Sequence, residues 1–166
     1  MESERDRPRA SVPKAGSPGR GGGEGGTNGP TGGVLLVEDN PEFRALLKKT
    51  LLSRFSGISV FEAGGAEEGL RKIRDCLPRI AFLDVRLPDG SGLALARTVC
   101  REHPHVCVIV CTAHDLPEYA EAARRAGVAH FLVKQSLDLE HVLTLVEEAL
   151  LAPETPPEPS TPAFPR

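Results

Sequence analysis

The sequence predicts an α/β protein built around a parallel β-sheet. Five short apolar segments alternate with five segments in which apolar residues recur every three or four positions. This alternation is typical of parallel sheets, because two parallel neighbours need a long crossover connection that is usually a helix. The segment VCVIVCTA, residues 106–113, is apolar throughout and rich in β-branched residues. It indicates a central strand that is covered on both faces.

The two ends of the chain differ from the rest in composition. Residues 1–33 contain ten glycines and four prolines, and Val12 is their only large aliphatic residue after Met1. Such a segment buries too little apolar surface to offset the entropy of ordering, so we expect it to be disordered. Residues 152–166 contain six prolines, and we expect a second disordered tail of extended character. One folded domain is therefore predicted over residues 34–151.

The first half of the domain contains three predicted strands and two predicted helices. The strands are expected at residues 34–38, 58–63 and 80–84. Asn40 and Pro41 provide a good N-cap and first-turn pair for the first helix. The apolar positions of this helix are Phe43, Leu46, Leu47 and Leu51. The residues that mark the second helix and its end are Leu70, Ile73, Leu77 and Pro78.

The second half continues the alternation with strands at residues 106–113 and 130–134. The helix between residues 84 and 106 has one apolar face, made of Leu93, Ala96, Val99 and Cys100. The fourth helix is short and weakly apolar, and it is expected to stop at Gly127, a natural C-terminal cap. Its apolar positions are Ala122, Ala123 and Ala126. Those of the last helix are Leu139, Val142, Leu143, Val146 and Leu150.

Polar residues stand at the carboxyl ends of four predicted strands. In open parallel α/β sheets, ligands bind beyond these ends. The residues in these positions are Glu38 and Asp39 after the first strand, Asp84 after the third, Thr112 after the fourth and Lys134 after the fifth. We expect these side chains to converge on one edge of the sheet.

The convergent residues suit phosphoryl chemistry. Three crowded carboxylates repel one another and raise at least one pKa unless a cation joins them, and oxygen ligands of this kind suit Mg²⁺. A carboxylate such as Asp84 also acts as a nucleophile toward phosphorus. Lys134 and the Thr112 hydroxyl would then contact phosphoryl oxygens. Taken alone, Asp84 is better explained as a solvated turn residue, so the hypothesis depends on the whole set.

Four segments together resemble a known family. They are LLVEDNPEFR, DVRLPDGSGL, VCTA and HFLVK. With these segments in this order, the chain from Val34 to about Leu151 resembles a response regulator receiver domain, the CheY-like family of two-component signalling. The resemblance implies a doubly wound, flavodoxin-like sheet of five parallel strands in the order 2-1-3-4-5, with five helices.

The resemblance also implies roles for the residues around the acid cluster. Asp84 matches the phosphoacceptor, and Asp39 matches the acid that binds Mg²⁺ directly. Glu38 matches the second acid, which in the family often acts through a metal-bound water. The backbone carbonyl of Arg86 matches the third protein ligand of the metal.

Further roles follow from the same resemblance. Thr112 and Lys134 match the pair that binds the phosphoryl group, and Thr112 also matches the switch residue. Phe131 matches the aromatic residue that moves inward when the threonine is drawn to the phosphoryl group, although plain core packing also explains it. Arg86 and His114 occupy the two variable positions beside the phosphoryl site. We hypothesise that these bulky side chains restrict attacking water and set the phosphoryl lifetime.

One departure from the family concerns the loop after Lys134. The family usually has a proline after the lysine, often with a cis bond, whereas this chain has Gln135. A cis bond before a residue other than proline costs about 3–4 kcal/mol. We therefore expect this loop to be trans or looser than in the family.

The expected function is that of a stand-alone receiver. A sensor histidine kinase or phosphotransfer protein would supply the phosphoryl group to Asp84, and the altered surface would bind an unknown downstream protein or a second copy of the chain. The protein would not be an enzyme beyond Mg²⁺-assisted phosphorylation and dephosphorylation at Asp84. One alternative is a pseudo-receiver scaffold that binds without phosphorylation. Another is a phosphatase of the haloacid dehalogenase type, but that class has an aspartate where Arg86 stands.

Composition argues against several other classes. The net charge is −3, with one tyrosine and no tryptophan, so nucleic-acid binding is not expected. No apolar run reaches the length of about 18 residues that a membrane span needs, and no apolar signal core is present. We therefore expect a cytoplasmic protein, no membrane contact and reduced cysteines.

Two further patterns are rejected as sites. The potential zinc ligands are Cys100, His103, His105, Cys107, Cys111 and His114. They cannot meet around one ion, because the predicted strand at 106–113 separates them. The segment GRGGGEGGTNGPTGG lacks the lysine and hydroxyl ending of a phosphate-binding loop, and it precedes a strand instead of joining a strand to a helix.

Overall fold

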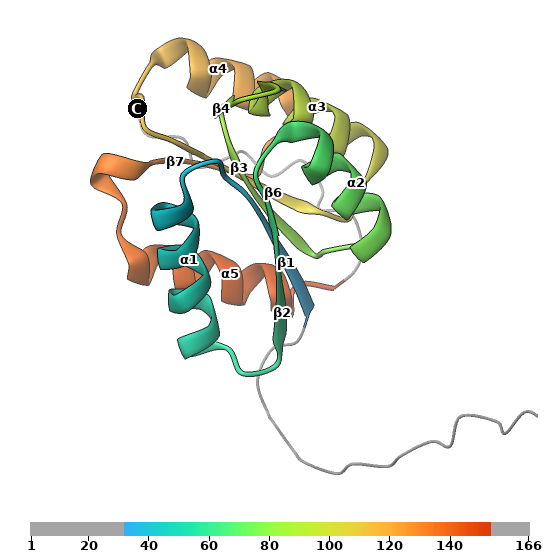
Figure 1. Ribbon diagram of the computed structural model, residues 1–166, viewed down its shortest axis with the longest axis vertical. Coiled ribbons are helices and arrows are strands. Elements are labelled where there is room, and N and C mark those ends of the chain that lie inside the picture. Colours follow the sequence, from blue (N-terminus) through green and yellow to red (C-terminus); the bar gives the residue numbers. More distant parts are fainter. Residues whose placement is uncertain (1–31, 154–166) are drawn as a thin grey trace, which may run out of the picture.

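The computed structural model describes residues 32–153 and confirms the doubly wound α/β fold. Its main sheet has five parallel strands in the order β2-β1-β3-β6-β7. In Figure 1, α1 and α5 cover one face of this sheet and α2, α3 and α4 cover the other. Counted along the chain, the five strands have the expected order 2-1-3-4-5. The predictions of disorder for the two tails concern residues that lie largely outside the described part of the chain.

The strands begin and end close to their predicted bounds. The five strands of the main sheet are β1 Gly32–Val37, β2 Ile58–Ala63, β3 Ile80–Asp84, β6 Cys107–Thr112 and β7 His130–Val133. β1 begins two residues before the predicted start of the domain, because Gly32 and Gly33 pair with Ile58 and Ser59 of β2. A small antiparallel hairpin of β4 Arg86–Leu87 and β5 Gly90–Ser91 follows β3.

Four α-helices connect the strands of the main sheet, and a fifth follows the last strand. They are α1 Pro41–Arg54, α2 Ala66–Cys76, α3 Gly92–Glu102, α4 Pro117–Ala126 and α5 Leu139–Leu151. The Asn40 side chain caps α1 by accepting bonds from the backbone N–H groups of Glu42 and Phe43 at 2.9 and 3.2 Å. Gly127 ends α4 in the left-handed conformation, with φ of 83°. Both predicted caps are therefore confirmed.

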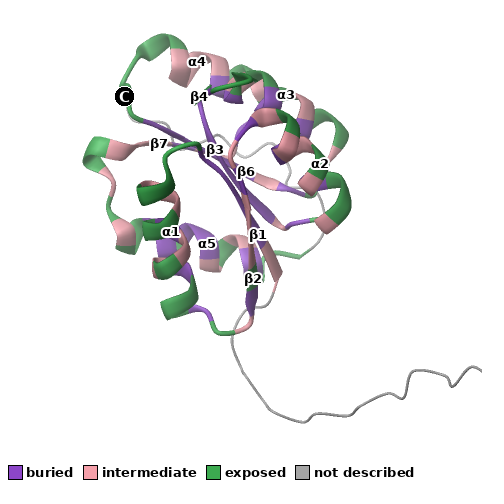
Figure 2. Cartoon of the chain, viewed as in Figure 1, coloured by how far each residue is buried: buried purple, intermediate pink, exposed green. Residues whose placement is uncertain are grey.

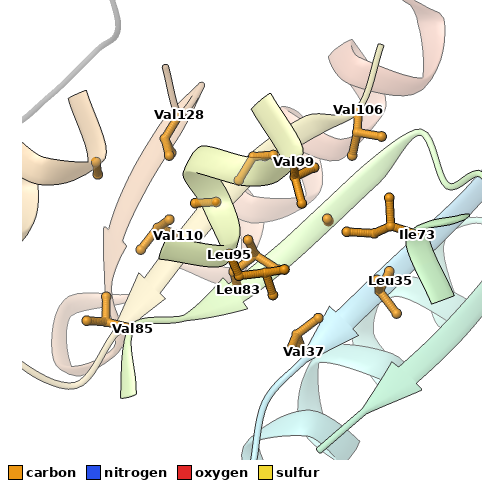
Figure 3. Packing of buried hydrophobic residues seen from close by; sticks show 14 of the residues in the cluster. Leu35, Val37, Ile73, Leu83, Val85, Leu95, Val99, Val106, Val110 and Val128 are labelled. Atoms are coloured by element: carbon orange, nitrogen blue, oxygen red, sulfur yellow. The ribbon is translucent and has the colours of Figure 1, made fainter. Parts of the chain in front are cut away.

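The core consists of two apolar layers, one on each face of the sheet (Figure 2). Along β6, Val108 and Val110 belong to the layer under α2, α3 and α4, whereas Ile109 and Cys111 belong to the layer under α1 and α5. This alternation confirms that β6 is a central strand covered on both faces. Figure 3 shows part of the first layer, where Leu95 and Val99 of α3 pack near Leu83 of β3.

Three helix faces differ in detail from the predicted ones. Leu46 of α1 is 45% exposed, because the buried side of this helix is centred on Leu47 and Leu51. On α3, Leu95 is buried and Leu93 only partly so. On α5, Leu145 is buried while Leu139 at the first turn is half-buried. A periodic pattern alone leaves the exact direction of a helix face open by about one residue position, or 100°.

Gly92 is needed where α3 begins directly behind the end of β3. Its N–H donates to the Val85 carbonyl oxygen at 2.9 Å. A Cβ atom at this position would lie 1.6 Å from the Asp84 carbonyl oxygen. The contact is with backbone, so no side-chain movement relieves it.

We therefore expect Gly92→Ala to lower the free energy of unfolding by about 3 kcal/mol or more, as severe overpacking does. The measurement is urea unfolding followed by circular dichroism. Gly90→Ala is the matched control, since the nearest atom to its Cβ would be Ala66 Cβ at 3.8 Å. It should change stability by no more than about 0.5 kcal/mol. Equal midpoints for both variants would contradict the close approach.

Candidate functional site

The predicted polar residues do meet at the carboxyl edge of the sheet. Glu38 directly follows β1, Asp84 is the last residue of β3, Thr112 is the last residue of β6 and Lys134 directly follows β7. The strands are short and in parallel register, so their ends lie side by side. The residues that meet at this edge are far apart in the chain, and Glu38 and Lys134 are separated by 96 positions.

Lys134 binds two buried carboxylates. Its Nζ lies 2.5 Å from Glu38 Oε2 and 2.9 Å from Asp84 Oδ2. Glu38 and Asp84 are only 3% and 7% exposed. We call these three residues the acid–lysine cluster. When both carboxylates are ionised, the single ammonium leaves one negative charge of the cluster uncompensated.

Burial and pairing act in opposite directions on the charged groups of this cluster. Burial lowers the pKa of Lys134, but the hydrogen bonds to Glu38 and Asp84 together with their charges outweigh it, and the pKa is raised overall. Burial raises the pKa of Glu38, and the hydrogen bond from Lys134 offsets this only in part. Lys134 therefore carries its positive charge at neutral pH.

The acids of this edge fit a divalent cation. Glu38, Asp39 and Asp84 offer carboxylate oxygens that lie within 4.8 Å of one another, and Asp39 is the exposed member. When all three are ionised, one ammonium leaves two negative charges uncompensated. Hard oxygen ligands beside solvent suit Mg²⁺, which keeps several waters. Within residues 32–153 this is the one group of three or more potential metal ligands.

Glu38 is held more firmly than the other acids. Its Oε1 accepts the backbone N–H of Asn40 at 3.0 Å, and its Oε2 accepts from Lys134. Its carbonyl oxygen accepts from Arg44 Nη1 at 2.6 Å. This role of Arg44 was not predicted from the sequence. The indirect role of Glu38 through a metal-bound water, which the family resemblance implies, stays a prediction.

Thr112, His114 and Arg86 form a chain beside Asp84. Thr112 is fully buried, and its Oγ1 accepts the backbone N–H of His114 at 3.1 Å. Arg86 Nη1 lies 3.0 Å from His114 Nε2. Arginine only donates, so this ring nitrogen accepts and carries no proton in the bond. The backbone N–H of Arg86 also donates to Asp84 Oδ1 at 3.3 Å. This bond connects Arg86 and His114 to the acid–lysine cluster.

Phe131 lies inside the protein. It is 3% exposed on β7 and packs in the layer under α2, α3 and α4. This position fits core packing and also fits the inward position of a switch residue. Its switch role stays a prediction, as does the metal contact of the Arg86 carbonyl.

The peptide bonds of the loop after Lys134 are trans, which is one of the two conformations expected from the absence of proline at position 135. All peptide bonds within residues 32–153 are trans. Residues Lys134–Ser136 form a short 3₁₀ helix, η1, and the Ser136 hydroxyl donates to the Val133 carbonyl oxygen at 3.4 Å. Lys134 reaches its carboxylate partners without a proline at position 135.

The rejected zinc site is not formed. The group of potential metal ligands in the described part of the chain includes no cysteine or histidine. Burial raises the pKa of Cys111 to about 12 and those of Cys100 and Cys107 to about 11. These raised pKa values reflect apolar surroundings, in which the thiols are protonated at neutral pH.

Asp89 has a structural role that the sequence did not reveal. Its carboxylate accepts the backbone N–H groups of Ala66 and Glu67 at 2.6 and 2.9 Å, at the start of α2. The residue before α2 is Gly65, whose position has no side chain to cap the helix. A Cβ at Gly65 would lie 2.7 Å from Asp89 Oδ1. Asp89 therefore ties the hairpin after Asp84 to the neighbouring helix.

Fold and site together define a class: a doubly wound α/β domain with a lysine-paired aspartate and an acidic metal-type cluster at the carboxyl edge of its sheet. Residues 34–147 match the model of the response regulator receiver domain family. The chain therefore belongs to the response regulator receiver domain family of two-component signalling. Phosphorylation and Mg²⁺ are typical of this family.

Curated and solved relatives agree with this assignment. The positive alginate biosynthesis regulatory protein of Pseudomonas aeruginosa is 38% identical over 114 residues, which cover 66% of this chain and 45% of that protein. A CheY-like receiver domain protein from Methanospirillum hungatei JF-1 has a TM-score of 0.66 and 27% identity, with 72% of this chain and 94% of that chain covered. This chain thus spans less than half the length of the alginate regulator.

A third relative is described with a modified aspartate. It is a response regulator protein from Burkholderia pseudomallei with a phosphorylated aspartic acid, a calcium ion and citrate. Its TM-score is 0.63 and its identity 25%, covering 70% of this chain and 68% of that chain.

No helix within residues 32–153 is long and apolar enough to span a membrane. The cytoplasmic location expected from the sequence stays a prediction.

The cap that Asp89 provides should make stability depend on pH. Its two backbone bonds hold the pKa of Asp89 below the usual range, so its stabilising effect is present above the unfolded-state pKa and is lost as pH falls through the folded-state pKa. We expect Asp89→Ala to lower the thermal midpoint at neutral pH, and the gap to the unchanged protein to close at acidic pH. Asp89→Asn, which keeps an acceptor oxygen, should show a smaller loss at neutral pH, and its margin over Asp89→Ala should not change with pH. A gap that stays constant into acid would contradict this role.

Proposed function

We propose that this domain accepts a phosphoryl group on Asp84 and thereby switches a partner-binding surface. The observation that carries the proposal is the position of the Asp84 carboxylate, which lies at the end of a buried strand 2.9 Å from the Lys134 ammonium. Thr112 stands at the end of the next strand, and two further acids stand at the end of β1. The phosphorylated aspartic acid of the Burkholderia pseudomallei relative supports the same chemistry.

In the transfer step one bond to phosphorus forms and another breaks. An Asp84 oxygen forms the new O–P bond while the P–N bond of a phosphorylated histidine on the donor breaks, and the electron pair of that bond returns to the imidazole. Lys134 moves from the carboxylate to a phosphoryl oxygen, where its charge stabilises the transferred group. The Thr112 hydroxyl donates to another phosphoryl oxygen. Asp39 and Asp84, with Glu38 acting through water and the Arg86 carbonyl, would hold a Mg²⁺ ion whose charge offsets the phosphoryl oxygens.

The switch would start at Thr112. In the unphosphorylated state its Oγ1 accepts from the His114 N–H. Turning the hydroxyl toward the phosphoryl group draws the end of β6 toward Asp84, and Phe131 on the neighbouring β7 adjusts its packing. The surface that changes is the one formed by α4, β7 and α5.

The partners follow from this scheme. A sensor histidine kinase or a phosphotransfer protein supplies the phosphoryl group, and a downstream protein surface or a second copy of the chain reads the switched face. The domain converts no external substrate in this proposal, and its chemistry is limited to forming and losing the bond at Asp84. A stand-alone role without nucleic-acid contact stays part of the proposal.

Phosphorylation can be tested directly. Incubation with Mg²⁺ and acetyl phosphate should add the mass of one phosphoryl group, measured by intact-protein mass spectrometry, and Asp84→Asn should abolish the gain. Asp75→Asn, an exposed aspartate on α2, is the matched control and should label normally. If neither small donors nor histidine kinases label the protein, the pseudo-receiver scaffold is the better explanation. Multiple turnover of phosphomonoesters would instead point to the phosphatase.

The Arg86–His114 pair is expected to lengthen the phosphoryl lifetime. The two side chains are hydrogen-bonded beside Asp84, where they limit the approach of water. Arg86→Ala and His114→Ala should each speed dephosphorylation severalfold, measured as loss of label after donor removal. Arg97→Ala, an exposed arginine of α3, should leave the rate unchanged. Unchanged rates in both site variants would show that water access is controlled elsewhere.

A further inference from the structure

The Lys134 ammonium is enclosed on three sides. Two sides are the carboxylates of Glu38 and Asp84, at 2.5 and 2.9 Å. On the third side the ammonium lies over the Phe43 ring, 4.7 Å from its centroid. The Lys134 side chain is only 14% exposed. An ammonium has three N–H donors, and the two carboxylates accept from it while the Phe43 ring lies against the same group.

Phe43 is held in place by the start of α1. Its backbone N–H donates to the capping oxygen of Asn40 at 3.2 Å, and its ring packs against the apolar layer under α1 and α5. The same cap follows directly after Glu38 and Asp39. The position of the ring is therefore fixed by the local structure that also fixes the two acids of β1.

The backbone on the other side of Lys134 restrains it less. η1 is closed by a Leu137 N–H to Lys134 carbonyl bond of 3.4 Å and by the Ser136 hydroxyl bond of the same length. Both are at the long end of hydrogen-bond distances. Gln135 and Ser136 are exposed. The orientation of the lysine thus depends on what surrounds its ammonium.

We propose that Phe43 is a positioning residue for Lys134. Its ring excludes water from the third side of the ammonium and keeps it against the edge of the sheet by a cation–π contact. When the phosphoryl group forms on Asp84, the ammonium has one short movement open to it, from the carboxylate to a phosphoryl oxygen. Keeping the ammonium poorly hydrated also strengthens its attraction to that oxygen.

The contact itself is measurable without any phosphorylation. A proton above an aromatic ring is shifted upfield in its NMR spectrum, so the ε-methylene protons of Lys134 should show this shift in the unchanged protein. Phe43→Leu, which keeps apolar volume and removes the ring, should abolish it, and Phe43→Tyr should keep it. Phe61→Leu is the matched control, since Phe61 is a half-buried phenylalanine on β2 outside the site. If the leucine variant does not fold, Phe43→Met removes the ring equally.

The kinetic consequence rests on the proposed function. With Mg²⁺ and acetyl phosphate, Phe43→Leu should slow labelling of Asp84 by about threefold to thirtyfold, the range expected for losing a partly desolvated cation–π contact. Phe43→Tyr and Phe61→Leu should label at the rate of the unchanged protein. A retained Lys134 shift in Phe43→Leu, or a lost shift with an unchanged rate, would overturn the inference. If the unchanged protein takes no label, the proposed function fails, and the NMR result alone decides whether Phe43 holds Lys134.

Discussion

The Lys134 bonds to Glu38 and Asp84 are the interaction on which the rest of the site depends. They join the ends of β1, β3 and β7, and they are the reason that two buried carboxylates are tolerated within a few ångströms. Removing one partner from such a buried set leaves an uncompensated charge, which typically costs about 3–5 kcal/mol. The lysine therefore stabilises the unphosphorylated Asp84 carboxylate. In the proposed function, the same lysine then binds the phosphoryl group on Asp84.

The fold supplies these charges by bringing strand ends together. β3 lies between β1 and β6, with apolar layers on both faces, so Asp84 is a buried carboxylate at the end of an enclosed strand. The chain then has little freedom, because Gly92 passes against the Asp84 carbonyl and Asp89 is bonded to the start of α2. A carboxylate on a rigid strand end followed by an anchored hairpin is held more precisely than one on an open loop.

Sequence patterns predicted the strands, their order and the polar residues at their ends, because apolar runs and strand–helix alternation are local signals. They left the direction of helix faces uncertain, which is why Leu46 was expected inside and is exposed. They could not reveal the bonds of Asp89 to α2 or of Arg44 to the Glu38 carbonyl. These contacts join residues through the folded geometry, and Asp89 and Ala66 are 23 positions apart in the chain. The ring of Phe43 over Lys134 was hidden for the same reason.

The charges at the sheet edge also indicate how a local event could reach a distant surface. Lys134 and Phe131 lie on one short segment at β7, and Thr112 pairs in register with Val133 between them. A phosphoryl group that draws both the lysine and the threonine would pull β6 and β7 from the same side. Glu38 also accepts the backbone N–H of Asn40, so the end of β1 depends less on the position of the lysine. The asymmetry would direct the change toward β7 and the helices on either side of it, rather than toward α1.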